Sequence, residues 1–185
     1  PLPIPEAAFP ETCEGESVVP VGVENGAAFN HAWTINGAAF SGTGANTAAP
    51  EFPNVACGDS AGLVLIQNIG VDGVILMCES EELVQPLNVV ALAMPEVSAA
   101  SPLCNGLDAD FTFAETEDGS GCSPFSAAYE WTFVAGETSL GHSGIGPFTF
   151  PAGTFEDIQV TVEAQSSGAD GTVCPSTDAF VFTMT

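Results

Sequence analysis

Apolar and polar residues alternate strictly at several places along this chain. In Tyr129–Phe133 three aromatic side chains alternate with Glu130 and Thr132, and Ile158–Glu163 alternates in the same way. Successive side chains of a β-strand point to opposite faces, so each segment predicts a strand with one buried face. No stretch keeps an apolar period of 3.6 residues over the length of a helix. The pattern therefore predicts an all-β protein.

The most apolar run, Ala61–Met77, is also interrupted by polar residues and glycines. It contains Gln67, Asn68 and Asp72, which are unfavourable inside a lipid bilayer. We therefore expect two buried strands around a turn here, and not a membrane span. A second turn is predicted at Asn36-Gly37, because this dipeptide is the strongest short signal for a two-residue hairpin.

The chain's two tryptophans lie in similar surroundings. Trp33 and Trp131 are each followed by threonine and an apolar residue. From tryptophan to a later Cys-x-Ser the gap is 45 residues in the first case (33 to 78) and 43 in the second (131 to 174). Recurrence in the same order at similar spacing indicates a duplicated domain. We expect three segments: an extended proline-rich leader (1–12), a first domain (13–93) and a second domain (94–185).

Six cysteines, none in a Cys-x-x-Cys motif, indicate a disulfide framework formed in an oxidising compartment. Cys13 and Cys104 each open a copy of the repeat as Cys-x-Gly. By the order of the repeat we expect Cys13 to bond to Cys78 and Cys104 to bond to Cys174. Each bond would stabilise its domain by about 2–4 kcal/mol, mainly by restricting the unfolded chain.

Cys57 and Cys122 have no counterpart in the other copy. Three roles remain open for them: a bridge between the domains, bonds to neighbouring subunits, or a different pairing such as Cys104 with Cys122. Because six cysteines allow many connectivities, the repeat order alone does not decide among these.

The arrangement as a whole resembles a known family. Cys-x-Gly, a Trp-Thr strand, an alternating strand and then Cys-x-Ser resemble immunoglobulin-like β-sandwich repeats of the polycystic-kidney-disease (PKD) type. The resemblance covers nearly the whole chain in two copies. The family's Trp-Asp-Phe-Gly-Asp-Gly segment appears only as Trp33–Gly37 and Trp131–Gly136. The resemblance implies two tandem immunoglobulin-like antiparallel β-sandwiches, of the kind found in secreted bacterial surface proteins and adhesins.

The charge is extreme, with 24 carboxylates, no lysine and no arginine, giving a net charge of -24. Only His31 and His142, when protonated, offer a cationic side chain. Nucleic acid is an unsuitable partner, since phosphate is neutralised by Lys or Arg, and anionic membranes are disfavoured for the same reason. Salt, bound cations or an acidic habitat would relieve the self-repulsion; alternatively, the charge only keeps an apolar surface soluble.

The acidic loop 115–120 is the best candidate for a cation site. Glu115, Glu117 and Asp118 could supply several of the six to eight oxygen ligands that Ca²⁺ takes. The loop lacks EF-hand spacing, however, so a solvated acidic turn is the competing interpretation. No other cofactor is indicated.

Catalytic motifs are absent from the sequence. Asp170-Gly171-Thr172 has the residues of an aspartic-protease motif in the wrong order, and the segment around His142 misses the nucleophile-elbow pattern. With no nucleophile and base placed together, we expect a protein that is not an enzyme. His142 is expected on an exposed loop, and His31, beside a core strand, is expected to be structural.

Two functions are compatible with these observations. The first is a non-catalytic structural subunit of an extracellular filament, sheath or adhesin stalk, which would bind copies of itself in a homopolymer. Its leader, residues 1–12, would dock on a neighbour's sheet edge by strand addition. The second is a carbohydrate- or ligand-binding module of a secreted protein, which would need exposed aromatic side chains. Phe148 and Phe150 are the pair that this second function would use.

Overall fold

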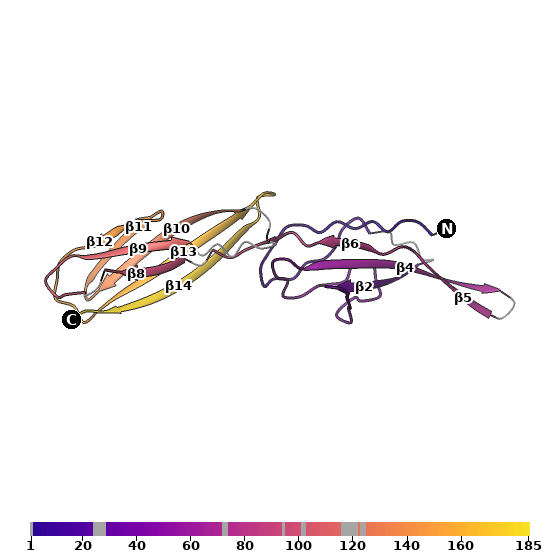
Figure 1. The fold of residues 1–185 in the computed structure, drawn as a ribbon, viewed down its shortest axis with the longest axis horizontal. Coiled ribbons are helices and arrows are strands. Elements are labelled where there is room, and N and C mark those ends of the chain that lie inside the picture. Colours follow the sequence, from indigo (N-terminus) through magenta and orange to yellow (C-terminus); the bar gives the residue numbers. More distant parts are fainter. Residues whose placement is uncertain are drawn as a thin grey trace. The chain divides into compact units, whose positions relative to one another are not determined.

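The computed structural model describes residues 2–23, 29–71, 74–93, 95–100, 103–115, 122 and 125–185, and these residues contain strands and no helix. Contacts divide the chain into two compact units (Figure 1). Unit 1 comprises Pro1–Ala91 together with Gly119–Ser123, and unit 2 comprises Leu92–Asp118 together with Pro124–Thr185. The predicted leader, residues 1–12, is thus part of unit 1.

The strands of unit 1 are β1 (Thr12–Cys13), β2 (Asn30–Ile35), β3 (Ala38–Ala39), β4 (Ser60–Val71), β5 (Val74–Glu79), β6 (Leu83–Pro86) and β7 (Val89–Val90). Those of unit 2 are β8 (Pro95–Ala99), β9 (Ala109–Glu115), β10 (Phe125–Ala135), β11 (Thr138–Ser143), β12 (Phe148–Phe150), β13 (Asp157–Gly168) and β14 (Val173–Thr183). Both units are therefore built from strands alone in the part of the chain described, as the alternation predicts.

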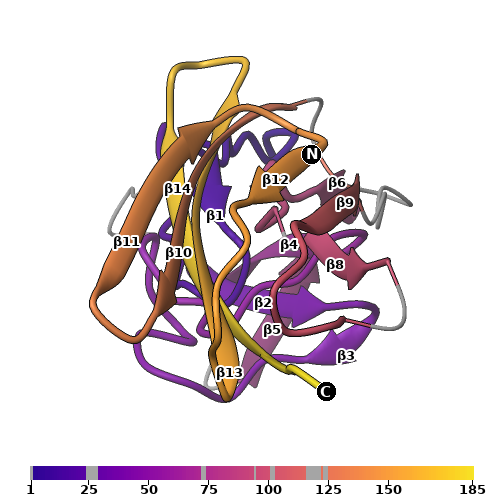
Figure 2. The same cartoon turned by 90° about the vertical axis from the view of Figure 1, so that its left-hand side faces the viewer.

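Unit 2 is a sandwich of two antiparallel sheets. One sheet has the order β11-β10-β13-β14 and the other has the order β12-β9-β8. In Figure 2 the strands β11 and β10 lie on one side of unit 2, and β9 and β8 lie on the other. The predicted strand Tyr129–Phe133 lies within β10, and its three aromatic side chains are buried, with Trp131 only 1% exposed. In β13 the alternating residues from Ile158 to Ser166 point inward to the same core. The predicted immunoglobulin-like sandwich is confirmed in this unit.

Unit 1 has a more irregular sandwich. Its main sheet has the order β3-β2-β4-β5, with β6 pairing the first half of β4. The opposite side consists of β1 paired in parallel with β7, and of single bridges such as Val18 with Phe52. The core between the two sides includes Trp33, Phe52 and Leu65. Phe9 of the predicted leader is also buried in this core.

Both tryptophan strands run into a two-residue turn. Ile35 pairs with Ala38 around Asn36-Gly37, and both turn residues have positive φ, 51° and 76°. Such φ values define the type I′ turn, whose twist matches the twist of paired strands. The predicted hairpin is therefore confirmed. Unit 2 also has a two-residue turn, between β10 and β11, but there only the first turn residue, Gly136, has a positive φ, 56°.

Each indole is also fixed in the same way. The Nε1–H of Trp33 donates to the carbonyl of Thr47 at 2.8 Å, and the Nε1–H of Trp131 donates to the carbonyl of Gly144 at 2.6 Å. The acceptors lie 14 and 13 residues after their tryptophans. A buried indole N–H needs such an acceptor, because an unpaired polar group in a core is costly. The two units therefore share this local arrangement as well as the strand.

The apolar run Ala61–Met77 is only partly buried. Ala61, Leu63 and Leu65 of β4 lie in the core, but every residue of β5 is exposed. The prediction of two buried strands is therefore wrong for the second strand. The reason lies in the pairing: β5 joins only the distal part of β4, from Ile66 onward, where no described segment covers the sheet.

The predicted cysteine pairing is also wrong. Cys13 and Cys174 are disulfide-bonded, but their expected partners, Cys78 and Cys104, retain thiols. Cys174 is buried near the start of β14, whereas Cys78 is exposed near the end of β5. Similar spacing from tryptophan therefore does not place these two cysteines at equivalent positions. This is why the repeat order fails to predict the bonds.

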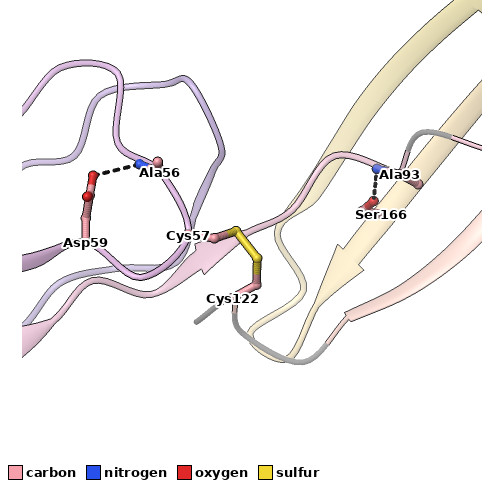
Figure 3. The surroundings of a disulfide bond; sticks show 6 residues. All are labelled: Ala56, Cys57, Asp59, Ala93, Cys122 and Ser166. Carbon is pink, nitrogen blue, oxygen red and sulfur yellow. Dashed lines mark hydrogen bonds between the residues drawn. A yellow bond between two sulfur atoms is a disulfide. The ribbon is translucent and has the colours of Figure 1, made fainter. Parts of the chain in front are cut away.

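Cys57 and Cys122 bond to each other, with Cα atoms 4.5 Å apart (Figure 3). Cys57 lies in a tight turn in which a carboxylate oxygen of Asp59 accepts the N–H of Ala56 at 2.8 Å. The other carboxylate oxygen of Asp59 accepts a hydrogen bond from the amide of Asn36 at 2.7 Å. Asp59 thus links the turn that contains Cys57 to the Asn36-Gly37 turn.

Candidate docking surfaces

The distal half of the β4–β5 hairpin forms an arm, which we define as residues 66–71 of β4 and 74–79 of β5. In Figure 1 β5 and the end of β4 that pairs with it extend past the other strands of unit 1. Four consecutive residues of β5 are large, apolar and at least half exposed: Val74, Ile75, Leu76 and Met77. Because successive side chains of a strand face opposite ways, both faces of the arm are uncovered. Apolar exposure of this kind is typical of a surface that binds another protein.

The arm is also almost uncharged. In a chain with 24 carboxylates, residues 66–71 and 74–78 contain none, and Glu79 lies at the base. Met77 and the thiol of Cys78 add two soft, polarisable side chains to the surface. The outer edge of β5 pairs with no other strand in the described residues, so its backbone N–H and C=O groups are available for strand addition.

Unit 2 has an open side between the edges of its two sheets. β8 pairs only with β9, and β14 pairs only with β13, within the described residues. Between these edges lies a groove of about 340 Å³, lined by Ala99, Ala100, Leu103, Val181, Phe182, Thr183 and Thr185. None of these residues is charged. We call this feature the β8–β14 groove.

The two ends of β14 border different hollows. A second, smaller hollow of about 230 Å³ lies beside Ala93, Ala164 and Asp178, so it includes a carboxylate. Its wall is fixed by Ser166, whose buried hydroxyl accepts the N–H of Ala93 at 3.0 Å (Figure 3). Of these two hollows, the β8–β14 groove is the one lined only by uncharged residues, and it lies beside the C-terminal end of β14.

The thiol-bearing cysteines lie in or next to these two surfaces. Cys78 is part of the arm, and Cys104 directly follows Leu103 of the groove. The backbone on either side of Cys104 is hydrogen-bonded to Thr185. Thr185 donates its N–H to the carbonyl of Leu103 at 2.8 Å and accepts the N–H of Asn105 at 3.0 Å.

Most of the predicted calcium ligands lie outside the described residues. Glu115 is the last residue of β9, and Glu117 and Asp118 lie outside the described residues. Among the residues that are described, no group of three or more His, Cys, Asp or Glu side chains is arranged to hold a metal ion. The Ca²⁺ site therefore stays a prediction.

Both histidines lie on strands. His31 is buried in β2, as expected for a structural residue. His142 lies on β11, not on an exposed loop, and its ring stacks on Phe148 with centroids 4.6 Å apart. It also meets Phe133 edge-on at 5.7 Å. The prediction of an exposed loop is wrong because β11 continues through Gly141 and ends only at Ser143, directly before Gly144.

The aromatic pair considered for ligand binding belongs to the core of unit 2. Phe150 is buried, and Phe148 is partly buried against Phe113 and His142. Neither forms an exposed aromatic platform. Loops rich in glycine, such as residues 40–47 of unit 1, border a shallow hollow, but its single aromatic side chain, Phe40, packs on Phe52.

No helix among the described residues is long and apolar enough to cross a membrane. Four cysteines in disulfides are compatible with an oxidising, extracellular environment. Sequence reasoning missed the arm and the groove because exposure of a strand depends on what covers it. The one available signal for the arm was the apolar run Ala61–Met77, in which Asp72 is the single charged residue.

No protein-family model matches the chain, and no curated protein matches it in sequence. Solved structures give weak similarities. They include three N-terminal domains of the outer capsid protein Hoc of bacteriophage RB49 (12% identity, TM-score 0.38, 98% of this chain and 58% of that one). Titin domains A168–A170 (15%, 0.35, 98% and 66%) and a two-domain fibronectin type III segment of chicken tenascin (10%, 0.33, 96% and 99%) are similar to the same degree. The chain thus spans less than two thirds of the phage and titin chains, and at these scores the sandwich assignment rests on strand pairing alone.

Proposed function

We propose that this chain is a non-catalytic structural subunit of an extracellular filament, sheath or adhesin stalk, in which it associates with copies of itself. The observation that carries the proposal is the arm, which exposes Val74–Met77 on both faces of a strand. Leaving this apolar surface in water is unfavourable, and covering it requires a partner.

The charge of the chain disfavours binding to nucleic acids and to anionic membranes. A net charge of -24 without a single lysine or arginine repels phosphate and anionic lipid. The same charge keeps individual copies soluble until the repulsion is screened. Two disulfides in a chain of this size support an oxidising location outside the cell.

The test is the assembly state of the full chain as a function of salt. At low ionic strength we expect monomers, and above roughly 0.15 M, where the Debye length is about 8 Å, we expect linear assemblies. Light scattering would give the mass and negative-stain electron microscopy would give the shape. A chain that remains monomeric at every salt and protein concentration would overturn the proposal.

A further inference from the structure

We propose that the arm of one copy docks in the β8–β14 groove of a second copy, and that a disulfide between Cys78 and Cys104 then locks the contact. This inference rests on the proposed function and names its interface. It assigns a donor surface to unit 1 and an acceptor surface to unit 2, so each copy can bind two others in a chain of head-to-tail contacts.

Charge limits where two copies can touch. Every copy carries the same excess of carboxylates and no cationic side chain apart from its histidines, so a contact that buries acidic surface on both sides is repulsive. Residues 66–71 and 74–78 of the arm carry no charged side chain, Asp72 being the one carboxylate between them in the sequence, and the residues that line the groove are uncharged. These two surfaces are therefore compatible with each other in a way that the acidic faces of the copies are not.

The backbone geometry of the two surfaces also matches. Both β5 and β14 are edge strands in the described residues, and an edge strand presents a row of unpaired N–H and C=O groups. β5 has six residues, about 20 Å at 3.3 Å per residue, and β14 has eleven. A strand added to an edge gains main-chain hydrogen bonds, and its side chains enter pockets beside that edge. Val181 on the outer face of β14, which is 65% exposed, would then be covered.

The cysteines point to the same pair of surfaces. Four of the six are already oxidised, and the two thiols that remain lie one on the arm and one directly after Leu103 of the groove. Bond formation removes two electrons and two protons from the thiols. A small-molecule disulfide such as oxidised glutathione accepts both, so that two molecules of glutathione leave as one protein disulfide forms.

The disulfide is tested by mixing two complementary variants. Cys104→Ser keeps only the arm thiol, and Cys78→Ser keeps only the groove thiol. With oxidised glutathione we expect a ladder of covalent oligomers from the natural chain, a single covalent dimer from the mixture, and neither from each variant alone. Peptide mapping without reduction should find Cys78 joined to Cys104.

Two outcomes of this experiment would overturn the inference. One is a Cys78–Cys104 bond within monomers with no dimer in the mixture, which would place the arm on its own chain. The other is dimerisation of Cys104→Ser alone to the level of the mixture, which would mean that arms pair with arms.

The non-covalent contact is tested with matched valines under reducing conditions. Val74 on the arm and Val84 on β6 are both 59% exposed, so Val74→Asp and Val84→Asp add the same charge at the same exposure. We expect Val74→Asp to raise the protein concentration needed for assembly at least about tenfold, since a charge buried without a partner is costly, and Val84→Asp to leave it unchanged.

The same comparison applies to the acceptor. Val181→Asp adds a charge in the groove and should raise the protein concentration needed for assembly. Val173→Asp adds a charge at the other end of the same strand and should leave it unchanged. Equal assembly of all four variants and the natural chain would refute the arm–groove contact and leave the structural function standing. Absence of assembly in the natural chain as well would refute both.

Discussion

Units 1 and 2 share a tryptophan strand but differ at the edges of their sheets. Each unit buries one indole, fixes its N–H on a later carbonyl, and turns through a two-residue loop after the strand. Unit 1 then pairs β1 with β7 and extends the arm, whereas unit 2 leaves β8 and β14 as edges beside a groove. The similar cores set the fold, and the differing edges are the parts available for function.

The difference shows that burial and exposure are divided within a single strand. The first half of β4 contributes Ala61, Leu63 and Leu65 to the core, and its second half lies in the arm. The second half still contains Ile66, Ile69 and Val71, so the presence of apolar residues alone does not separate a structural from an interacting segment. Substitutions at matching positions of the two units test whether their cores are alike and their edges differ.

Removing an indole should have the largest effect. Trp33→Ala and Trp131→Ala each leave a large cavity in one core and an unused carbonyl acceptor. We expect each to lower the free energy of unfolding of its own unit by about 3–5 kcal/mol. Calorimetry should show one transition shifted and the other unchanged. A common shift of both transitions would mean that the units unfold together and would contradict their independence.

Loss of the Cys57–Cys122 bond should come next. Replacing both residues by serine opens a loop of 65 residues, and we expect the free energy of unfolding to fall by about 2–4 kcal/mol. Urea denaturation would measure the change. Cys78→Ser is the matched control, since it removes an exposed thiol and should change stability by less than about 0.5 kcal/mol. Equal stability of the double variant and the control would contradict the expectation.

The positive-φ glycines of the two turns should respond alike, although Gly37 is the second residue of its turn and Gly136 is the first of its own. An alanine Cβ would contact nothing within 4 Å at Gly37, and only Phe155, at 3.8 Å, at Gly136. Each substitution therefore costs only the strain of a positive φ, and we expect Gly37→Ala and Gly136→Ala to destabilise by about 1 kcal/mol. Thermal unfolding of the two variants would show whether the costs agree. A much larger loss at one glycine would show that positive φ is not the main cost of the substitution there.

Changes on the arm should have the smallest effect on folding. Ile75 is 75% exposed, so Ile75→Thr should alter the free energy of unfolding by less than about 0.5 kcal/mol. The contrasting position is Leu65 on the buried half of β4, where substitution by alanine should cost about 2–5 kcal/mol. Denaturation of the two variants in parallel provides the measurement. A large loss at Ile75 would show that the arm supports the fold of the monomer.

The sequence predicted those features that depend on neighbouring residues. The alternation in Ile158–Glu163 and Tyr129–Phe133 identified the strands and their inward faces, because a strand alternates wherever one face is covered. Asn36-Gly37 identified its hairpin, because positive φ at two successive residues suits few other dipeptides.

Features that depend on distant contacts were not predicted. Cys78 and Cys174 lie at similar distances from their tryptophans along the chain, but one is exposed and the other is buried. Likewise the exposure of Val74–Met77 follows from where β5 pairs along β4, which no local pattern records. The groove required knowledge of which strands end as sheet edges.

The single buried indole in each unit gives the molecule two built-in optical probes. Indole emission shifts to longer wavelength when the ring becomes hydrated, and each ring here reports on one unit alone. A Trp33→Phe variant would make unit 2 the only source of that signal, and Trp131→Phe would do the same for unit 1. Tyr129, with its ring 6.2 Å from that of Trp131, is close enough to pass excitation energy to it. The order in which the units open can therefore be followed without any attached label.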